Sequence, residues 1–140
     1  MNDSIVIIPT YNEIENIESI VRAVLSQHKS FHLLIIDDNS PDFTAEKVIA
    51  LQEEFSGRLF LEKRAKKSGL GTAYVHGFKW ALERQYDYIF EMDADFSHNP
   101  NDLEKLYDAC HFGGAHLAIG SRYVTGVNVV NWPLSRVLMS

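Results

Sequence analysis

The 140-residue chain carries 13 lysines and arginines against 19 aspartates and glutamates, which gives a formal net charge of −6. Nucleic-acid backbones favour positively charged surfaces, so we expect no nucleic-acid partner. Hydrophobic residues make up 46% and charged residues 23% of the chain, a composition typical of one globular domain. The single cysteine excludes an internal disulfide. The longest apolar runs are far shorter than the roughly 20 residues of a membrane-spanning helix.

The first half of the chain alternates apolar runs with stretches of helical period. Ser4–Pro9 and Phe31–Asp37 are apolar runs that predict buried strands. Asn12 is expected to cap the helix between them, and Glu15, three residues later, would complete a capping box. A second helix is expected after the second strand. The positions expected on the inner faces of these two helices are Ile14, Ile17, Val21, Val24 and Leu25, then Ala45, Val48, Ile49, Gln52 and Phe55.

The second half repeats this alternation. Arg58–Glu62 and Tyr86–Met92 are predicted strands, and Leu70–Leu82 between them has the period of a helix. Gly77 lies inside that helix, where glycine costs about 1 kcal/mol relative to alanine, so we expect close packing of the helix on the sheet. A fourth helix follows, with Asn99 as its cap, Pro100 at its first position and a core face of Leu103, Leu106, Tyr107 and Cys110.

A fifth strand is predicted at His116–Ser121. The resulting β-α-β-α-β-α-β-α-β order predicts an α/β fold, a Rossmann-like, mostly parallel sheet with helices on both faces. We expect residues 1–140 to form a single domain. The pattern weakens after Ser121, and a helix that could start at Pro133 stops at Ser140, which favours a chain that continues in a longer protein.

Polar residues follow each predicted strand. Ligands of open parallel sheets bind at the carboxyl ends of the strands, so these five loops predict one site at one edge of the sheet. They contain residues 9–13 (PTYNE), 37–42 (DDNSPD), 63–71 (KRAKKSGLG), 93–97 (DADFS) and 121–123 (SRY).

Asp93 and Asp95 are the main candidate metal ligands. Residues at positions i and i+2 of an extended chain project to the same side, so both carboxylates can face one cation. Carboxylate oxygens suit Mg²⁺ or Mn²⁺, and Mg²⁺ is often shared with substrate phosphates. Ser97 could add a hydroxyl. The alternative is that the aspartates cap the next helix, but Asn99 already fills that position.

A basic run before a glycine-rich helix start is a candidate anion site. Lys63, Arg64, Lys66 and Lys67 precede Gly69–Leu70–Gly71, where backbone N–H groups and the helix N-terminus favour a phosphate. A solvated charged loop is the alternative interpretation. The order of residues is not that of a P-loop, and the first strand lacks the GxGxxG of a dinucleotide fold, which argues against a nicotinamide dehydrogenase.

Three further polar residues could bind a nucleoside diphosphate. A base or ribose could donate hydrogen bonds to Asp38 and Glu13, and Arg122 could pair with the diphosphate. Arg122 could equally form a surface ion pair. No histidine spacing or cysteine cluster predicts a zinc site.

Taken together, these loops resemble the family 2 glycosyltransferases of the GT-A fold, and within them the polyprenol-phosphate (dolichol-phosphate) mannosyltransferases. Phe43 departs from the family, which usually has glycine there, and Ser97 stands where many relatives have glutamine. The segments that carry the resemblance span nearly the whole chain; they are Ile7–Asn16, Ile35–Glu46, Lys66–Leu82, Met92–Pro100, Ile119–Gly126 and Val129–Arg136.

The resemblance implies a role for each matching residue. Asp93, Asp95 and Ser97 would surround Mg²⁺ or Mn²⁺, and Asp93, Asp95 and Arg122 would act in catalysis. The nucleotide sugar would contact Pro9, Tyr11, Glu13, Ile36, Asp38, Lys67, Asp93, Ala94, Asp95 and Arg122.

The implied activity is inverting transfer of a hexose, mannose from GDP-mannose, to a polyprenyl or dolichyl phosphate at a membrane surface. No secretory leader is recognised, so the expected location is cytoplasmic, peripheral at the cytoplasmic face of the membrane. Two alternatives stay open. One is a family 2 enzyme that uses a UDP-sugar and a saccharide hydroxyl, and the other is a module that binds sugar nucleotide without consuming it.

Overall fold

A computed structural model describes residues 3–65, 69–95, 99–111, 117–119 and 128–131 of the chain. Strands and helices alternate through most of these ranges, as the sequence predicts. The strands are β1 (Ser4–Thr10), β2 (His32–Asp37), β3 (Leu59–Lys63), β4 (Tyr88–Glu91), β5 (Leu117–Ile119) and β6 (Asn128–Asn131). The helices are α1 (Ile17–Leu25), α2 (Thr44–Glu54), α3 (Leu70–Glu83) and α4 (Leu103–His111), with a 3₁₀ turn, η1 (Pro100–Asp102), before α4.

The sheet has the order β3-β2-β1-β4-β6-β5, and its first four strands are parallel. The predicted mostly parallel α/β fold is therefore confirmed. One strand was not predicted: β6 pairs antiparallel with β4 on one side and with β5 on the other, so β5 does not neighbour β4. The four residues of β6 have two valines between two asparagines, too short an apolar run to indicate a strand. Pairing with β5 and with β4, which is far away in the sequence, supplies its hydrogen bonds.

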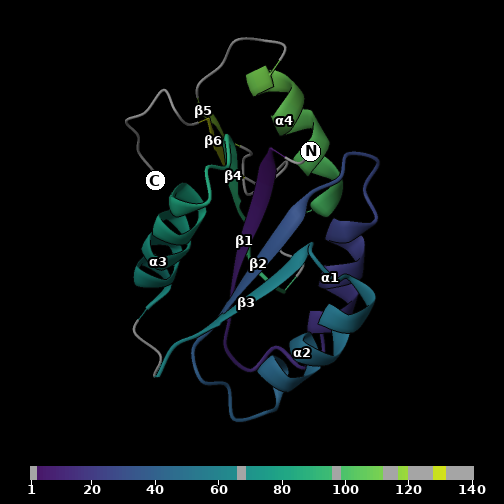
Figure 1. The fold of residues 1–140 in the computed structure, drawn as a ribbon, viewed down its shortest axis with the longest axis vertical. Coiled ribbons are helices and arrows are strands. Elements are labelled where there is room, and N and C mark those ends of the chain that lie inside the picture. Colours follow the sequence, from purple (N-terminus) through teal and green to yellow (C-terminus); the bar gives the residue numbers. More distant parts are fainter. Residues whose placement is uncertain (1–2, 66–68, 96–98, 112–116, 120–127, 132–140) are drawn as a thin grey trace.

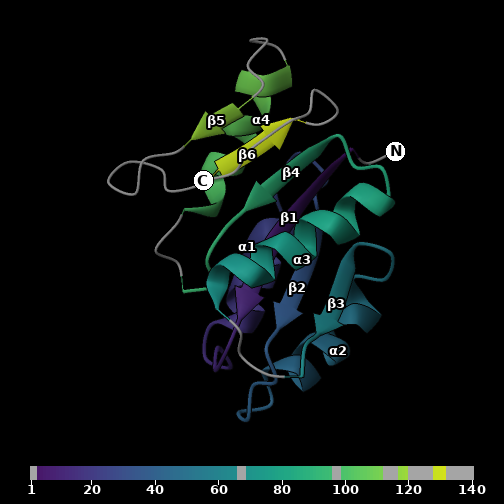
Figure 2. The same cartoon turned by 90° about the vertical axis from the view of Figure 1, so that its left-hand side faces the viewer.

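Helices cover both faces of the parallel strands. In Figure 1, α1, α2 and α4 lie on one side of the sheet and α3 lies on the other. Figure 2, turned by 90°, shows α3 across the front of the strands. Side chains alternate along each strand, so two hydrophobic clusters form: one joins Val6, Ile8 and Phe90 to α1, α2 and α4, and the other joins Ile5 and Ile7 to α3.

Gly77 brings α3 close to β1. A Cβ atom at this position would lie 2.6 Å from Cγ2 of Ile7, whose side chain is fully buried. Ala73 and Ala81, one turn away on either side, are fully buried in the same cluster. Close packing of this helix on the sheet, expected from the glycine, is therefore confirmed.

The expected cap of the first helix is wrong. Helix α1 begins at Ile17 rather than after Asn12, and Asn12 has a left-handed backbone with φ of 57°. Its N–H donates to Oγ of Ser40 at 3.0 Å, so a contact between distant loops overrides the local capping signal. Ile14 lies before the helix and is 38% exposed, not in the core. Across the described ranges, no helix is both long enough and apolar enough to cross a membrane.

Candidate active site

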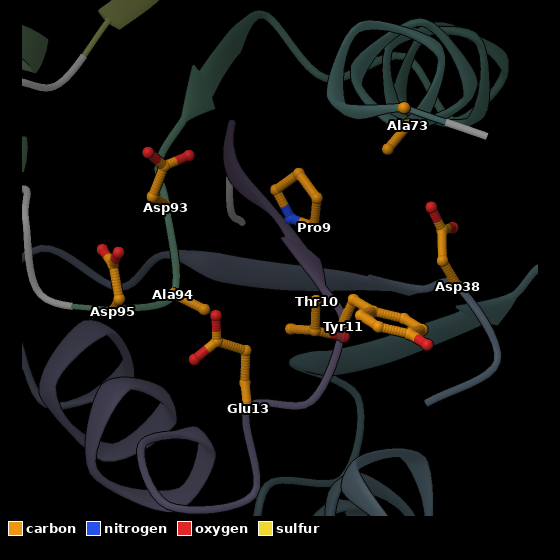
Figure 3. Close-up of a pocket in the computed structure, with 10 residues that line it drawn as sticks. Pro9, Thr10, Tyr11, Glu13, Asp38, Ala73, Asp93, Ala94 and Asp95 are labelled. Carbon is orange, nitrogen blue, oxygen red and sulfur yellow. The ribbon is translucent and has the colours of Figure 1, made fainter. Parts of the chain in front are cut away.

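A pocket lies at the carboxyl ends of β1 and β4, where the chain order of the sheet reverses. Strands β2 and β3 extend the sheet to one side of β1, and β4 adds on the other side. Such a switch point is the usual ligand site of an open α/β sheet. The cavity measures about 280 Å³. It is lined by Pro9, Thr10, Tyr11, Glu13, Asp38, Gly69, Ala73, Asp93, Ala94 and Asp95 (Figure 3).

Asp93 and Asp95 stand together at one end of this pocket, and Asp38 stands at the other (Figure 3). Asp93 is partly buried and Asp95 is exposed. Neither is the cap of the following helical turn, because the side chain of Asn99 accepts the N–H of Asn101 at 3.0 Å in that position. Both carboxylates are therefore placed where a ligand in the pocket can reach them.

Tyr74 of α3 contacts Asp93. Its hydroxyl donates to Oδ1 of Asp93 at 3.1 Å. Burial raises the pKa of the Tyr74 phenol far above its usual range, and the negative charges of Asp93 and Glu91 raise that pKa further. The phenol therefore remains protonated at neutral pH and donates to the carboxylate.

At the other end of the pocket, Asp38 is bound by Arg64. The guanidinium donates from Nε to Oδ1 at 2.6 Å and from Nη2 to Oδ2 at 2.7 Å, and both side chains are largely buried. Nη1 of Arg64 also donates to the hydroxyl of Thr72 in α3 at 3.1 Å. The hydrogen bond to Asp38 raises the pKa of Arg64. Arg64 thus fixes the carboxylate of Asp38 and joins the ends of β2 and β3 to the start of α3.

The neighbouring Asp37 has a structural role. Its carboxylate is fully buried and accepts from the hydroxyl of Thr10 at 2.7 Å, from the hydroxyl of Ser40 at 2.6 Å and from the Ser40 N–H at 2.9 Å. These bonds close the turn after β2 and join it to the end of β1. Asp37 therefore stabilises the turn, and Asp38 is the member of the pair that lines the pocket.

The loops after β1 and β2 are held together by polar contacts. The N–H groups of Glu13 and Ile14 donate to the Thr44 hydroxyl and to Oδ2 of Asp42, both at 3.1 Å. Partial burial raises the pKa of Asp42, but the hydrogen bonds from the Thr44 hydroxyl and from the Ile14 N–H outweigh that effect and lower it. Phe43, between Asp42 and Thr44, has a left-handed backbone with φ of 71° and a side chain that is 69% exposed.

The start of α3 forms part of the pocket wall, on the side of Arg64 and Asp38. Gly69 precedes the helix with φ of 99°, a backbone conformation that favours glycine, and it lines the pocket together with Ala73. The helix N-terminus therefore adjoins the pocket, a favourable place for an anion.

The structure places most of the expected site residues in this pocket. Ile36 differs: it is fully buried in the α3-side cluster, because alternation along β2 turns its side chain toward the core, and it is not among the lining residues. Lys67, Ser97 and Arg122 lie outside the described residues. The predicted site residues that line the pocket are Pro9, Tyr11, Glu13, Asp38, Asp93, Ala94 and Asp95.

The sequence interpretation missed several contributors. Thr10 and Ala73 line the pocket without a chemical signature of their own, and Tyr74 lies in a helical run whose pattern indicates core packing. The sequence indicates Arg64 only as one member of a basic run. Its position two residues after the predicted strand Arg58–Glu62 is the available signal, because the strand end brings it to the same edge as Asp38.

The donor atoms of the pocket suit a hard divalent cation. Among the described residues, no group of three histidine, cysteine, aspartate or glutamate side chains converges as a complete metal site. Two carboxylates, Asp93 and Asp95, line one end of the cavity. This set fits the binding mode of Mg²⁺, which commonly uses one or two carboxylates and shares the rest of its coordination with substrate phosphates and water.

Comparison with known proteins gives one consistent family. Residues 5–139 match the sequence profile of "Glycosyl transferase family 2". The polyprenol monophosphomannose synthase of Mycolicibacterium smegmatis is 47% identical over 137 residues, which are 98% of this chain and 51% of that protein. The undecaprenyl-phosphate mannosyltransferase of Micrococcus luteus is 43% identical, over 96% of this chain and 54% of that protein. The chain thus spans about half the length of these curated relatives.

A solved structure shares the fold. The mannosyltransferase PcManGT from Pyrobaculum calidifontis, in complex with GDP-Man and Mn²⁺, superposes with a TM-score of 0.74 at 17% sequence identity. The match covers 92% of this chain and 44% of that one.

Proposed function

Because this chain belongs to glycosyl transferase family 2, we propose that residues 1–140 form the nucleotide-sugar-binding domain of an inverting mannosyltransferase. The donor is GDP-mannose and the acceptor is a polyprenyl phosphate. The names of the two relatives support mannose and a polyprenyl carrier. The observation that carries the proposal is the pocket itself, in which Asp93 and Asp95 at the end of β4 face the same cavity as Glu13 and Asp38.

We assign the aspartate end of the pocket to the diphosphate and its cation. Asp93 and Asp95 would hold Mg²⁺ or Mn²⁺, with Ser97 as a third contact, and Mn²⁺ in the complex of PcManGT supports this choice of ion. When bound, the cation supplies positive charge next to the leaving diphosphate. Lys67 and Arg122 would add positive charge to the same group. The N-terminus of α3, which contacts Arg64 at the Asp38 end of the pocket, favours negative charge in the cavity.

The opposite end of the pocket is assigned to the nucleoside. Tyr11, from the loop after β1, points toward this end, and Asp38 projects into it from the end of β2, whereas Glu13 lies nearer Ala94 and Asp95 (Figure 3). A carboxylate offers about four lone-pair sites, so Asp38 can accept further N–H or O–H groups while it binds Arg64. The Arg64 contacts set the direction in which these sites face.

The acceptor supplies its own nucleophile. A phosphate monoester has a second pKa near 6, so its oxygens are largely deprotonated at neutral pH. One of these oxygens forms the new bond to the anomeric carbon while the bond to the nucleoside diphosphate breaks with inversion. No side chain needs to remove a proton, and we assign no general base. The residues of the pocket bind and orient the donor and stabilise the charge that develops on it.

The acceptor also defines where the enzyme works. A polyprenyl phosphate is anchored in a lipid bilayer by its chain, so the pocket must operate at a membrane surface. We propose that the protein is peripheral at the cytoplasmic face, where nucleotide sugars are available.

Calorimetric titration of the 140-residue chain tests the proposal. We expect GDP-mannose to bind in the presence of Mn²⁺ or Mg²⁺, to bind more tightly than UDP-glucose, and to lose at least about tenfold in affinity when the ion is chelated. Asp95→Asn is expected to reproduce the effect of the chelator. Asp108→Asn, which changes an exposed acid on α4 away from the pocket, serves as the matched control and should bind like the parent chain.

Three results would contradict the proposal. They are binding of GDP-mannose that is indifferent to chelation, equal affinity in the Asp95→Asn and Asp108→Asn chains, and a clear preference for UDP-glucose. Turnover is measured on the full-length protein with a polyprenyl phosphate in detergent. Binding of GDP-mannose without transfer there would favour the non-catalytic module.

A further inference from the structure

Tyr74 joins the buried core to the acidic end of the pocket. Its hydroxyl donates to Oδ1 of Asp93, 19 residues later in the chain, at 3.1 Å. Tyr74 itself is not a lining residue of the cavity, although Ala73 beside it is. The phenol therefore approaches Asp93 from the core rather than from the side on which a ligand enters.

We propose that Tyr74 is a positioning residue that orients the carboxylate of Asp93 for the divalent cation. This rests on the proposed function, in which Asp93 is a metal ligand. A carboxylate rotates about the bond to its Cβ atom, and a hydrogen bond to one oxygen selects one orientation. That bond uses one of about four lone-pair sites, so capacity for a cation remains on the carboxylate. Hydrogen-bond partners of metal ligands commonly tune affinity in this way.

The position of the Tyr74 side chain is fixed by packing. Tyr74 packs against the α3-side cluster that contains Ile5, Ile7 and Ile36. Gly77, three residues later, holds α3 against Ile7 so closely that a Cβ atom there would lie 2.6 Å from Cγ2 of Ile7. The distance between the helix and the sheet is thereby set, and with it the reach of the hydroxyl toward the end of β4.

The two aspartates differ in burial. Asp93 is partly buried and held by a phenol from the core, whereas Asp95 is exposed. A carboxylate that is already oriented in the free protein loses little conformational freedom when it coordinates the cation, because its rotation is restricted beforehand. Asp93 thus provides the carboxylate that Tyr74 orients, and Asp95 adds a second carboxylate from the solvent side.

The test is the affinity of the 140-residue chain for Mn²⁺ with GDP present, measured by electron paramagnetic resonance of the free ion. Tyr74→Phe removes the hydroxyl and keeps the ring. We expect its Mn²⁺ affinity to fall about tenfold, within the range seen when partners of metal ligands are removed. Tyr86→Phe is the matched control, because it also removes a phenol hydroxyl that hydrogen-bonds another side chain, in this case the ring nitrogen of His32, far from Asp93. We expect it to bind Mn²⁺ like the parent chain.

A double-mutant cycle separates positioning from folding. In the Asp93→Asn background, Tyr74→Phe should cause no further loss of Mn²⁺ affinity, and urea unfolding reports whether each variant is folded. Equal Mn²⁺ affinity of the folded Tyr74→Phe and parent chains overturns the inference and leaves the proposed function intact. Failure of the parent chain to bind Mn²⁺ with GDP overturns the proposed function, and the inference with it. A tenfold loss that persists in the Asp93→Asn background also overturns the inference, because Tyr74 would then act through another group.

Discussion

Arg64 and Asp38 form a two-point ion pair, with N–O distances of 2.6 and 2.7 Å, at the nucleoside end of the pocket. The Asp38 side chain is 8% exposed and that of Arg64 14% exposed, so water screens the pair little. Arg64→Met keeps the length of the side chain but leaves a buried carboxylate without its partner. We expect this change to lower the free energy of unfolding by about 1–3 kcal/mol, measured by urea denaturation.

A surface arginine provides the comparison for this variant. Arg22 pairs with Glu18 and Glu54, and all three side chains are between 42% and 54% exposed. Because exposed pairs contribute little, Arg22→Met should destabilise the chain less than Arg64→Met does. If Arg22→Met and Arg64→Met lowered the free energy of unfolding equally, the burial of the Arg64–Asp38 pair would have no energetic consequence.

Phe43 carries backbone strain that glycine would remove. Its φ of 71° lies in the left-handed region, which is costly for a residue with a Cβ atom, and its ring is mostly exposed. Phe43→Gly and Phe43→Ala both delete the ring, but only glycine adopts this conformation freely. We expect the glycine variant to be about 1 kcal/mol more stable than the alanine variant by urea denaturation. If Phe43→Ala were as stable as Phe43→Gly or more stable, the proposed backbone strain at position 43 would be refuted.

At position 77, even the addition of one methyl group is expected to destabilise the fold. Gly77→Ala improves helix propensity by about 1 kcal/mol, but its methyl group would meet Ile7 at 2.6 Å. We expect net destabilisation of about 1–2 kcal/mol, seen as a lower midpoint of thermal unfolding. Gly71→Ala in the same helix is the control, since nothing lies within 4 Å of a Cβ atom there, and this variant should be neutral or stabilising. Equal changes in the unfolding midpoint for Gly77→Ala and Gly71→Ala would contradict the close contact between Gly77 and Ile7.

The lowered pKa of His32 should make the stability of the folded chain depend on pH. Burial lowers its pKa below the ordinary value of 6.5, and the positive charge of Arg58 lowers that pKa further. The unfolded chain therefore takes up a proton at His32 before the folded chain does, so the contribution of this residue to stability is complete above about pH 6.5 and is lost as the pH falls below it. We expect the stability difference between the parent chain and His32→Gln to shrink from about pH 7.5 to about pH 5, measured by urea denaturation at each pH. A difference that stays constant across this range would contradict the lowered pKa.

The sequence predicts those parts of the fold that depend on local pattern. Leu33, Leu34, Ile35 and Ile36 are all fully buried, and a continuous apolar run is what a central parallel strand covered on both faces requires. The parallel direction of strands β1 to β4 then follows from the alternation of strands and helices. Strand β6 could not be predicted in this way, because its four residues are held by pairing with β5 on one side and with β4, about 40 positions earlier in the chain, on the other.

The same limit applies to the site. Asp93, Asp95 and Asp38 were identifiable, since carboxylates after strands meet at one edge of the sheet. The contacts that hold them were not, because Tyr74 reaches Asp93 and Arg64 reaches Asp38 from other elements of the fold. At Asn12 the sequence predicts a helix cap that the structure does not have. Its N–H instead hydrogen-bonds Ser40, 28 residues away.

The late arrival of β6 has a consequence for biosynthesis. Strands β1 to β4 can pair as soon as residues 4–91 have left the ribosome, but the outer edge of β4 receives its partner only when Asn128–Asn131 follow. During that interval the nascent chain presents a short row of unsatisfied main-chain groups, the kind of template on which two chains can associate. Slow translation between residues 91 and 131 would lengthen the exposure and favour association between nascent chains.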